Sequence, residues 1–176
     1  MTEIIDRPRT LAPAMGRSEN NQLRYDNHFR EKKLSGDESC DLCKVADQHP
    51  LPLKIGGQTL EIAQKHIALI ENSFPYTVYD GQEVIDHKMI VPKKHYAELK
   101  DFPPDVYSEY MGSLALIMQE FDQTFTRSPS NNGSSIKAHS HTHALKFGRL
   151  VEELSYSKND GINLVRYRGE DWLHPL

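Results

Sequence analysis

Three histidines stand at alternate positions in the C-terminal third of the chain: His139, His141 and His143. If this stretch is a β-strand, side chains alternate between faces, so the three rings share one face at a spacing of roughly 6.5 Å. A row of imidazoles with that spacing can hold an anion or a metal ion, or attack a phosphorus atom. Three of the nine histidines of the chain are gathered here, which favours a functional site over a polar strand face.

A second group with chemical potential is the pair Cys40 and Cys43, the only cysteines of the chain. Residues 1–20 contain acidic side chains and no apolar core, so we expect no secretory signal and a cytoplasmic protein. In that setting two cysteines separated by two residues favour metal or redox chemistry over a structural disulfide. A structural zinc site needs four nitrogen or sulfur ligands, of which this pair supplies two.

Charge and hydropathy exclude two classes of partner. The chain has 21 basic and 25 acidic residues among 176, with a net charge of −4. A nucleic-acid groove needs a basic face, so no nucleic-acid partner is expected. No apolar run approaches the ~20 residues of a membrane span, so no membrane partner is expected either.

The chain length predicts one domain with extensions. We expect a polar N-terminal arm over residues 1–33, a compact domain over 34–150 and a C-terminal extension over 151–176. The arm lacks a sustained hydrophobic period, so it is expected to order only by packing on the rest of the protein.

Inside the compact domain, hydrophobic periodicity predicts strands at 66–71, 84–91 and 138–145 and one long helix at 104–126, with Pro104 in its first turn. Two weaker strand signals lie at 150–156 and 161–168. The short connections between strands require antiparallel neighbours. The predicted fold class is therefore α+β, with an antiparallel sheet of about five strands and one long helix.

The histidine row and its surroundings resemble the histidine-triad (HIT) superfamily of nucleotide hydrolases and transferases. In that family a strand ends in a Val-Ile-Pro-Lys-x-His type segment, and a helix and then the triad follow; here Val91 to His95 read Val-Pro-Lys-Lys-His. The stretch from Asn72 to Tyr76 is similar to the Asn-x-Phe-Pro segment of the dinucleoside-polyphosphate phosphorylase and galactose-1-phosphate uridylyltransferase branches. The resemblance covers roughly residues 38–147 and implies a HIT-like fold and a homodimer.

The resemblance implies catalytic roles for the triad. His141 matches the family's nucleophile, His143 the donor of a hydrogen bond to phosphate or leaving group, and His139 the first member. An imidazole is a neutral nucleophile near pH 7, so phosphate oxygens repel it less than they repel an anion. Attack at an α-phosphorus gives a nucleotidyl-histidine, which divides one difficult displacement into two easier ones.

Substrate-binding residues are also implied by the resemblance. Asn132, Gly133 and Ser135 match the phosphate-contacting loop, although loop serines are also common turn formers. Asn72 and Phe74 match residues that face the ribose and base. The alternative for this pair is a strand end closed by an Asx turn.

In the zinc-bearing members of the superfamily the cysteine pair is joined by two histidines, which match His95 and His139 here. The resemblance therefore implies a structural zinc ion held by these two histidines with Cys40 and Cys43. The alternative is a pair of free thiols.

The chain departs from the family pattern at several positions. Ser140 and Thr142 replace aliphatic residues inside the triad, so the back of this strand is expected to be less buried than usual. Asp86 stands where glycine is usual, and Lys146 and Phe147 replace the common Pro-Arg. These departures bear on substrate choice.

The predicted function is a nucleotide hydrolase or nucleotidylyltransferase acting on a dinucleoside polyphosphate, nucleoside phosphoramidate or similar compound. One alternative is a non-catalytic nucleotide-binding module. Another is a cupin-type metalloenzyme, since Gly133, His139 and His141 fit the opening of a cupin metal motif. Leu145 and Lys146 occupy the places where that motif requires a glutamate, which disfavours it.

Overall fold

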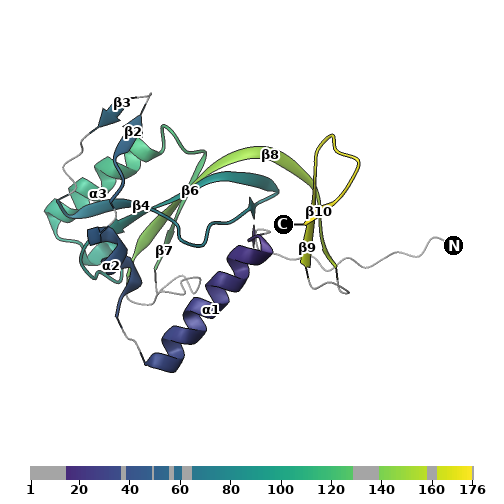
Figure 1. Cartoon of the computed structure of the whole chain (residues 1–176). Coiled ribbons are helices and arrows are strands. Elements are labelled where there is room, and N and C mark those ends of the chain that lie inside the picture. Colours follow the sequence, from purple (N-terminus) through teal and green to yellow (C-terminus); the bar gives the residue numbers. More distant parts are fainter. Residues whose placement is uncertain are drawn as a thin grey trace.

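The computed structural model describes residues 15–36, 39–48, 50–55, 58–60, 65–128, 139–157 and 162–175. Its helices are α1 (Glu19–Ser35), α2 (Asp41–Gln48), the 3-10 turn η1 (Leu99–Asp101) and α3 (Pro104–Ile117) (Figure 1). Its strands are β1 (Met15–Gly16), β2 (Leu53–Ile55), β3 (Gln58–Leu60), β4 (Ile67–Glu71), β5 (Val78–Tyr79), β6 (Gln82–Pro92), β7 (Gln123–Arg127), β8 (His141–Ser157), β9 (Ile162–Tyr167) and β10 (His174–Pro175).

The main sheet is antiparallel throughout and confirms the α+β class. Eight strands join it in the order β1-β5-β6-β8-β9-β10, while β4 also pairs with β6 and β7 with β8. Five of these strands, namely β4, β6, β7, β8 and β9, contain five or more residues. That number agrees with the predicted sheet of about five strands. Strands β2 and β3 form a separate hairpin.

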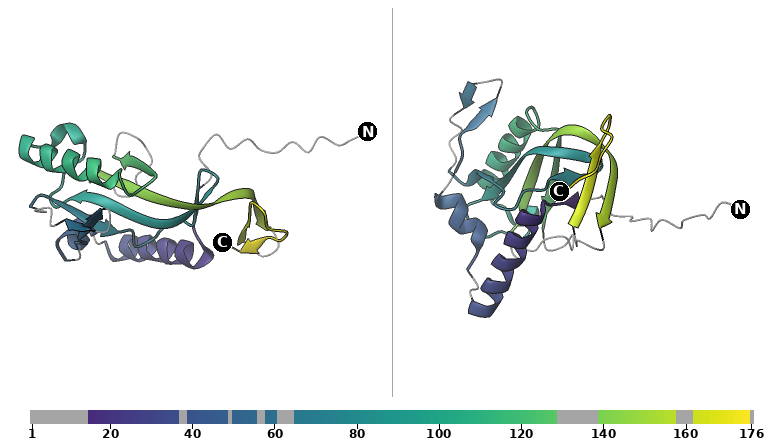
Figure 2. Two further views of the ribbon diagram at one scale, coloured as in Figure 1. Left: turned by 90° about the horizontal axis from the view of Figure 1, so that it is seen from above. Right: turned by 45° about the vertical axis from the view of Figure 1, so that its right-hand side comes forward.

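Helices cover the two faces of the sheet (Figure 2). In β4 the side chains of Ile67 and Leu69 pack toward α3 with Val106 and Tyr110, while alternate residues of the same strand pack toward α2. This alternation follows from the two-residue period of a strand. Figure 2 shows α3 on one side of the sheet and α1 with α2 on the other. The sheet is therefore the middle layer of three.

The predicted helix at 104–126 is too long. Helix α3 begins at Pro104 as expected but ends at Ile117, and Gln123–Arg127 forms strand β7. The sequence Gln-Thr-Phe-Thr-Arg is rich in β-branched and aromatic residues, which prefer strands, and it pairs with the first residues of β8. Tertiary pairing therefore decides against continuing the helical pattern.

The histidine strand begins later and extends further than predicted. Strand β8 starts at His141 and continues to Ser157, so it includes the weak strand signal at 150–156. The signal at 161–168 corresponds to β9. His139 and Ser140 precede the first residue of β8 and are both fully buried.

The N-terminal arm contains helix α1. At its start the Ser18 side chain accepts a hydrogen bond from the Asn21 amide. At its end stands Gly36, with φ 66°, whose amide donates a hydrogen bond to the Lys32 carbonyl. None of its residues is buried, so it lies on the surface of the body. Among the helices that the structure describes, none has the length and apolar character needed to cross a membrane. The division at residues 33 and 150 stays a prediction.

Candidate functional site

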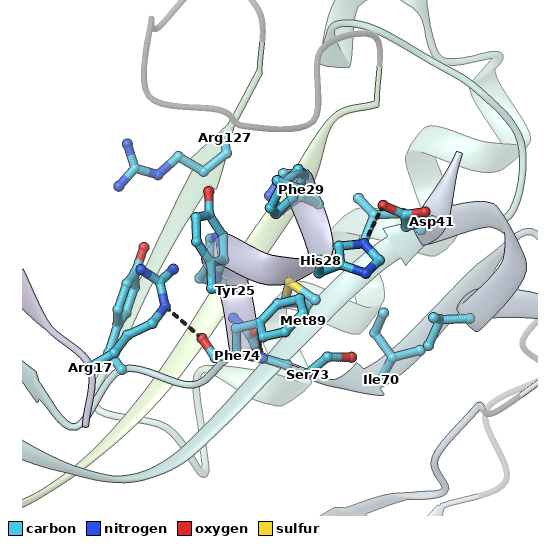
Figure 3. A pocket seen from close by; sticks show the side chains of 16 residues that line it. Arg17, Tyr25, His28, Phe29, Asp41, Ile70, Ser73, Phe74, Met89 and Arg127 are labelled. Atoms are coloured by element: carbon cyan, nitrogen blue, oxygen red, sulfur yellow. Dashed lines mark hydrogen bonds and ion pairs between the residues drawn. The ribbon is translucent and has the colours of Figure 1, made fainter. Parts of the chain in front are cut away.

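A pocket of about 600 Å³ opens on the α1 and α2 side of the sheet (Figure 3). That volume lies within the range typical of small-molecule sites. His141 and His143 line it from β8, Leu42 and Val45 from α2, and Asn72 and Phe74 from the segment after β4. The structure thus brings four of the sequence-predicted residues into one cavity.

His141 is oriented by the backbone of its own strand. Its Nδ1 atom lies 2.9 Å from the carbonyl oxygen of His139. A carbonyl oxygen only accepts hydrogen bonds, so Nδ1 carries the proton and Nε2 carries the lone pair. Burial lowers the pKa of His141, an effect that the hydrogen bond to His139 opposes and the charge of Arg127 reinforces. The ring is therefore neutral at pH 7, with a nucleophilic nitrogen on its outer side.

Hydrogen bonding to His87 gives His143 the opposite proton position to that of His141. The Tyr76 amide donates to Nδ1 of His87 at 3.1 Å, so neutral His87 carries its proton on Nε2. That nitrogen lies 2.8 Å from Nδ1 of His143 and 3.0 Å from the side-chain nitrogen of Asn72. An amide nitrogen accepts no hydrogen bond, so His87 donates its proton to His143. The proton of His143 is therefore on Nε2, which makes His143 a hydrogen-bond donor. The ring centroids of His141 and His143 are 5.0 Å apart, so acceptor and donor are neighbours.

Burial and nearby charged groups keep the rings of His87 and His143 neutral. The pKa of His87 falls to about 3 because of burial and the charge of Arg17. The pKa of His143 is lowered well below its usual value by burial and then by the charges of His87, His141, Arg127 and Arg17. His87 was missed from the sequence, although it stands in phase with Met89 and Val91 on a buried strand face.

The four proposed metal ligands meet at the other end of the triad. The ligand atoms of Cys40, Cys43, His95 and His139 all lie within 4.8 Å of one another, so this cluster could bind a metal ion. Nε2 of His139 donates to the Pro92 carbonyl at 2.7 Å, which leaves the Nδ1 lone pair 3.1 Å from Sγ of Cys40 and 3.7 Å from Sγ of Cys43. Such a partner on the second ring nitrogen is the usual support of a metal-binding histidine.

The donor set fits a zinc ion, because two thiols and two imidazoles are one of its structural ligand sets. Burial, followed by the charge of Cys40, raises the pKa of Cys43 to about 12, so an arriving metal ion must displace a proton. Burial lowers the pKa of His139 to about 4, so its ring is already neutral and able to bind a metal ion at pH 7.

The predicted substrate residues divide into two groups. Asn72 and Phe74 line the pocket, and the Asn72 side-chain oxygen also accepts from the Phe74 amide at 2.8 Å, as in an Asx turn. The Asx turn is therefore present, while contact of this pair with a ribose and base stays a prediction. Asn132, Gly133 and Ser135 lie outside the described residues, and their role in binding phosphate stays a prediction.

The prediction that the back of the histidine strand is less buried than usual is wrong. Ser140 is 0% and Thr142 1% exposed. Thr142 replaces an aliphatic residue but bonds to the hydroxyl of Tyr110 on α3 and, at 2.8 Å, to that of Thr126 on β7. These polar partners let a threonine occupy a buried position. The Ser140 hydroxyl is buried with no hydrogen-bond partner among the described residues.

Several pocket residues come from segments that sequence reasoning gave no chemical role. Arg17, Tyr25, His28 and Phe29 reach it from the N-terminal arm, and Arg127 from β7. Arg127 stands directly opposite His141 in the β7–β8 ladder. The sequence carries no local signal for these contacts, because the arm has no clear apolar stripe and β7 was expected to be helical.

No protein-family model and no curated protein matches the chain. The solved structures that are similar to it include two whose descriptions name the HIT family or the histidine triad. One is a HIT family hydrolase from Legionella pneumophila Philadelphia 1, with 22% sequence identity and a TM-score of 0.42. The match covers 63% of this chain and 94% of that chain. Another is a histidine triad protein from Clostridium difficile, with 23% sequence identity and a TM-score of 0.40. That match covers 66% of this chain and 96% of the other chain.

Proposed function

We propose that the chain is a histidine-triad nucleotide hydrolase or nucleotidylyltransferase that acts at an α-phosphate through a nucleotidyl-His141 intermediate. The observation that carries the proposal is the opposite protonation of two neighbouring rings in one pocket. Nδ1 of His141 keeps its proton because it donates to the His139 carbonyl, and His143 carries its proton on Nε2 because its Nδ1 accepts from His87. One ring can attack, and the next can donate a hydrogen bond.

The reaction takes place in two displacements. Nε2 of His141 forms a bond to the α-phosphorus, and the bond from phosphorus to the leaving group breaks, with its electron pair going to that group. The Nε2 proton of His143 hydrogen-bonds to the phosphate or the departing atom, where charge accumulates. Water, inorganic phosphate or another phosphorylated acceptor then attacks phosphorus and releases His141.

The remaining walls of the pocket suit a nucleoside. Leu42, Val45 and Ile70 provide an apolar surface, and Phe74 adds an aromatic ring at its edge. Such surfaces hold a flat base by contact and stacking. Asn72 lies beside them with polar groups suited to ribose hydroxyls. The nucleoside therefore occupies the α2 side, which places its phosphate against β8.

Zinc is the metal proposed for the cysteine cluster. Cys40, Cys43, His95 and His139 would hold it, and its chemistry there would be structural. They lie at and just before the start of α2, in the segment that follows β6 and in the residues before β8. Holding them together fixes the position from which the triad strand begins. The homodimer and the cytoplasmic location remain part of this proposal.

A non-catalytic nucleotide-binding module is the second candidate, since the same pocket could bind without turnover. The cupin-type alternative loses support, because His139 belongs to the cysteine cluster and His141 lines the pocket. A cupin motif needs both rings on one ion. Within the described residues, the one group of three or more possible metal ligands is the cluster that contains His139.

Steady-state turnover of a panel of dinucleoside polyphosphates and nucleoside phosphoramidates separates enzyme from binding module. His141→Asn is expected to lose at least ~10³-fold in kcat while retaining substrate affinity, because it removes the covalent nucleophile. The matched control is His66→Asn, which removes a histidine paired with Asp105 on α3. Near-normal turnover by His141→Asn, or no turnover by the wild type, would contradict the proposal.

A further inference from the structure

Two arginines line the pocket beside the two histidines of the triad that face it. The row of side chains runs from Arg127, opposite His141, through His141 and His143 to Arg17. We propose that Arg17 and Arg127 form a polyphosphate subsite, which selects nucleotides with at least one phosphate group beyond the α-phosphate that is attacked. This inference rests on the proposed function and narrows its substrate class from phosphoramidates to nucleotides with a polyphosphate chain.

Arg127 is placed beside the nucleophile by strand pairing. It stands directly opposite His141 in the antiparallel ladder of β7 and β8, and opposite residues project from the same face with Cβ atoms about 5 Å apart. Its guanidinium carbon lies 5.0 Å from the ring centre of Phe125, and that ring stacks on His143 at 4.7 Å. Arg127 therefore adjoins the position that the α-phosphate would take.

Arg17 is fixed at the other end of the row. Its Nε donates to the Phe74 carbonyl at 3.0 Å. Its guanidinium carbon lies 4.3 Å from the ring centre of Tyr25 and 4.7 Å from that of Tyr76, and the Tyr76 ring is 6.1 Å from His143. With Nε and both faces engaged, the two Nη groups are the donors left for a ligand, and their fork suits phosphate oxygens.

The segment that carries Arg17 is anchored to the sheet on both sides of this residue. Strand β1 pairs with β5 through Gly16, and the Ser18 amide donates to the Thr77 hydroxyl at 2.8 Å. A guanidinium held in this way loses little further conformational freedom on binding. Figure 3 shows Arg17 and Arg127 on the left of the pocket, away from His28 and Asp41 on the right.

The charge of the pocket favours a polyanion. Among the residues described around it, Asp41 is the one carboxylate, and it is already paired with Lys32 at 2.8 Å and His28 at 3.1 Å. Both guanidinium charges also contribute to the lowered pKa of His143, after burial and the neighbouring histidines, so both act on the reaction centre. Positive charge at the His143 end would stabilise the charge that develops on a departing phosphate.

The first test uses probes without a base: orthophosphate and pyrophosphate, titrated calorimetrically into the wild-type protein at about 0.15 M ionic strength, where long-range attraction is screened. Pyrophosphate is expected to bind at least ~10-fold more tightly, the size of one added charged hydrogen bond. Arg17→Gln and Arg127→Gln should each remove most of that ratio, and Arg17→Lys should restore part of it. The control Arg30→Gln, on the exposed side of α1 and bonded to Asn27, should leave it unchanged.

The second test compares kcat/KM for a dinucleoside polyphosphate and a nucleoside phosphoramidate. Arg17→Gln is expected to lower the first by ~10-fold or more and the second by less than ~3-fold. Equal affinity for the two phosphate probes in the wild type, or equal losses on both substrates, would overturn the subsite. A graded affinity for phosphates without any turnover would instead support the subsite and contradict the proposed function.

Discussion

The Nε2 atom of His87 lies 2.8 Å from the Nδ1 atom of His143, and the Tyr76 amide donates to the other nitrogen of His87. His87 thereby acts as a positioning residue that fixes the tautomer of His143. We expect His87→Phe to lower kcat/KM by at least ~10-fold, because supporting hydrogen bonds to functional histidines contribute on that scale. His87→Gln, which can still donate an N–H group, should recover part of the loss.

The measurement for this prediction is kcat/KM together with thermal unfolding of both variants. A merely structural role would make activity follow the loss of stability in each variant. If His87→Phe and His87→Gln are equally active at equal stability, His87 does not act through the tautomer of His143.

Two residues on the back of the triad strand should respond oppositely to loss of a hydroxyl. Ser140→Ala removes a buried hydroxyl with no partner among the described residues, so the free energy of unfolding is expected to rise by about 1 kcal/mol. Thr142→Val removes the partner of Tyr110, so it should lower that free energy by about 1–3 kcal/mol. Denaturant unfolding measures both, and a destabilised Ser140→Ala would show that this hydroxyl is satisfied.

Stability should fall as the solution becomes acidic, because His87 and His143 are buried as neutral rings. Burial lowers the pKa of both in the folded state, to about 3 for His87. Below the unfolded value of about 6.5 the unfolded chain binds more protons, so each ring lowers the free energy of unfolding by about 1.4 kcal/mol per pH unit. Unfolding between pH 6.5 and 5 should show this slope, reduced in His87→Phe. A flat profile over that interval would contradict the burial of neutral rings.

Zinc at the cysteine cluster gives a prediction that does not depend on activity. Elemental analysis of the purified protein is expected to show about one zinc ion per chain, with loss of the metal in Cys40→Ser. Chelation should lower the melting temperature, because the metal would connect three segments of the fold. His66→Asn, which lies outside the cluster, should retain the metal. A wild-type protein without metal and equally stable in chelator would exclude this role.

Local patterns in the sequence were sufficient for the centre of the site. The alternating histidines, the Pro-Lys-x-His segment and the cysteine pair carry the resemblance to the histidine-triad superfamily. That resemblance implied which residues meet, and the cluster of Cys40, Cys43, His95 and His139 confirms their proximity. These residues are informative because their types are rare and their spacing follows the period of a strand. The antiparallel sheet was predicted from the short connections between the expected strands.

The edges of the pocket could not be predicted, because they depend on contacts between distant parts of the chain. Arg17 reaches the Phe74 carbonyl across 57 positions, from a segment just before helix α1, which has no buried residue. Arg127 directly follows the predicted helix 104–126, whose apolar spacing through Phe121 hid the strand that carries this arginine. In both cases contacts between distant segments position the guanidinium group, and a local sequence pattern carries no information about such contacts.

The most direct test of the central claim is intact-mass spectrometry after brief mixing of the protein with a dinucleoside polyphosphate and rapid acid-free quenching. The account predicts a transient gain equal to one nucleoside monophosphate minus water, located on His141 and lost when inorganic phosphate or more time is supplied. In His141→Asn this adduct should not form, whereas it should form in His66→Asn. Turnover without any adduct in the wild type, or an adduct on a residue other than His141, would contradict the account.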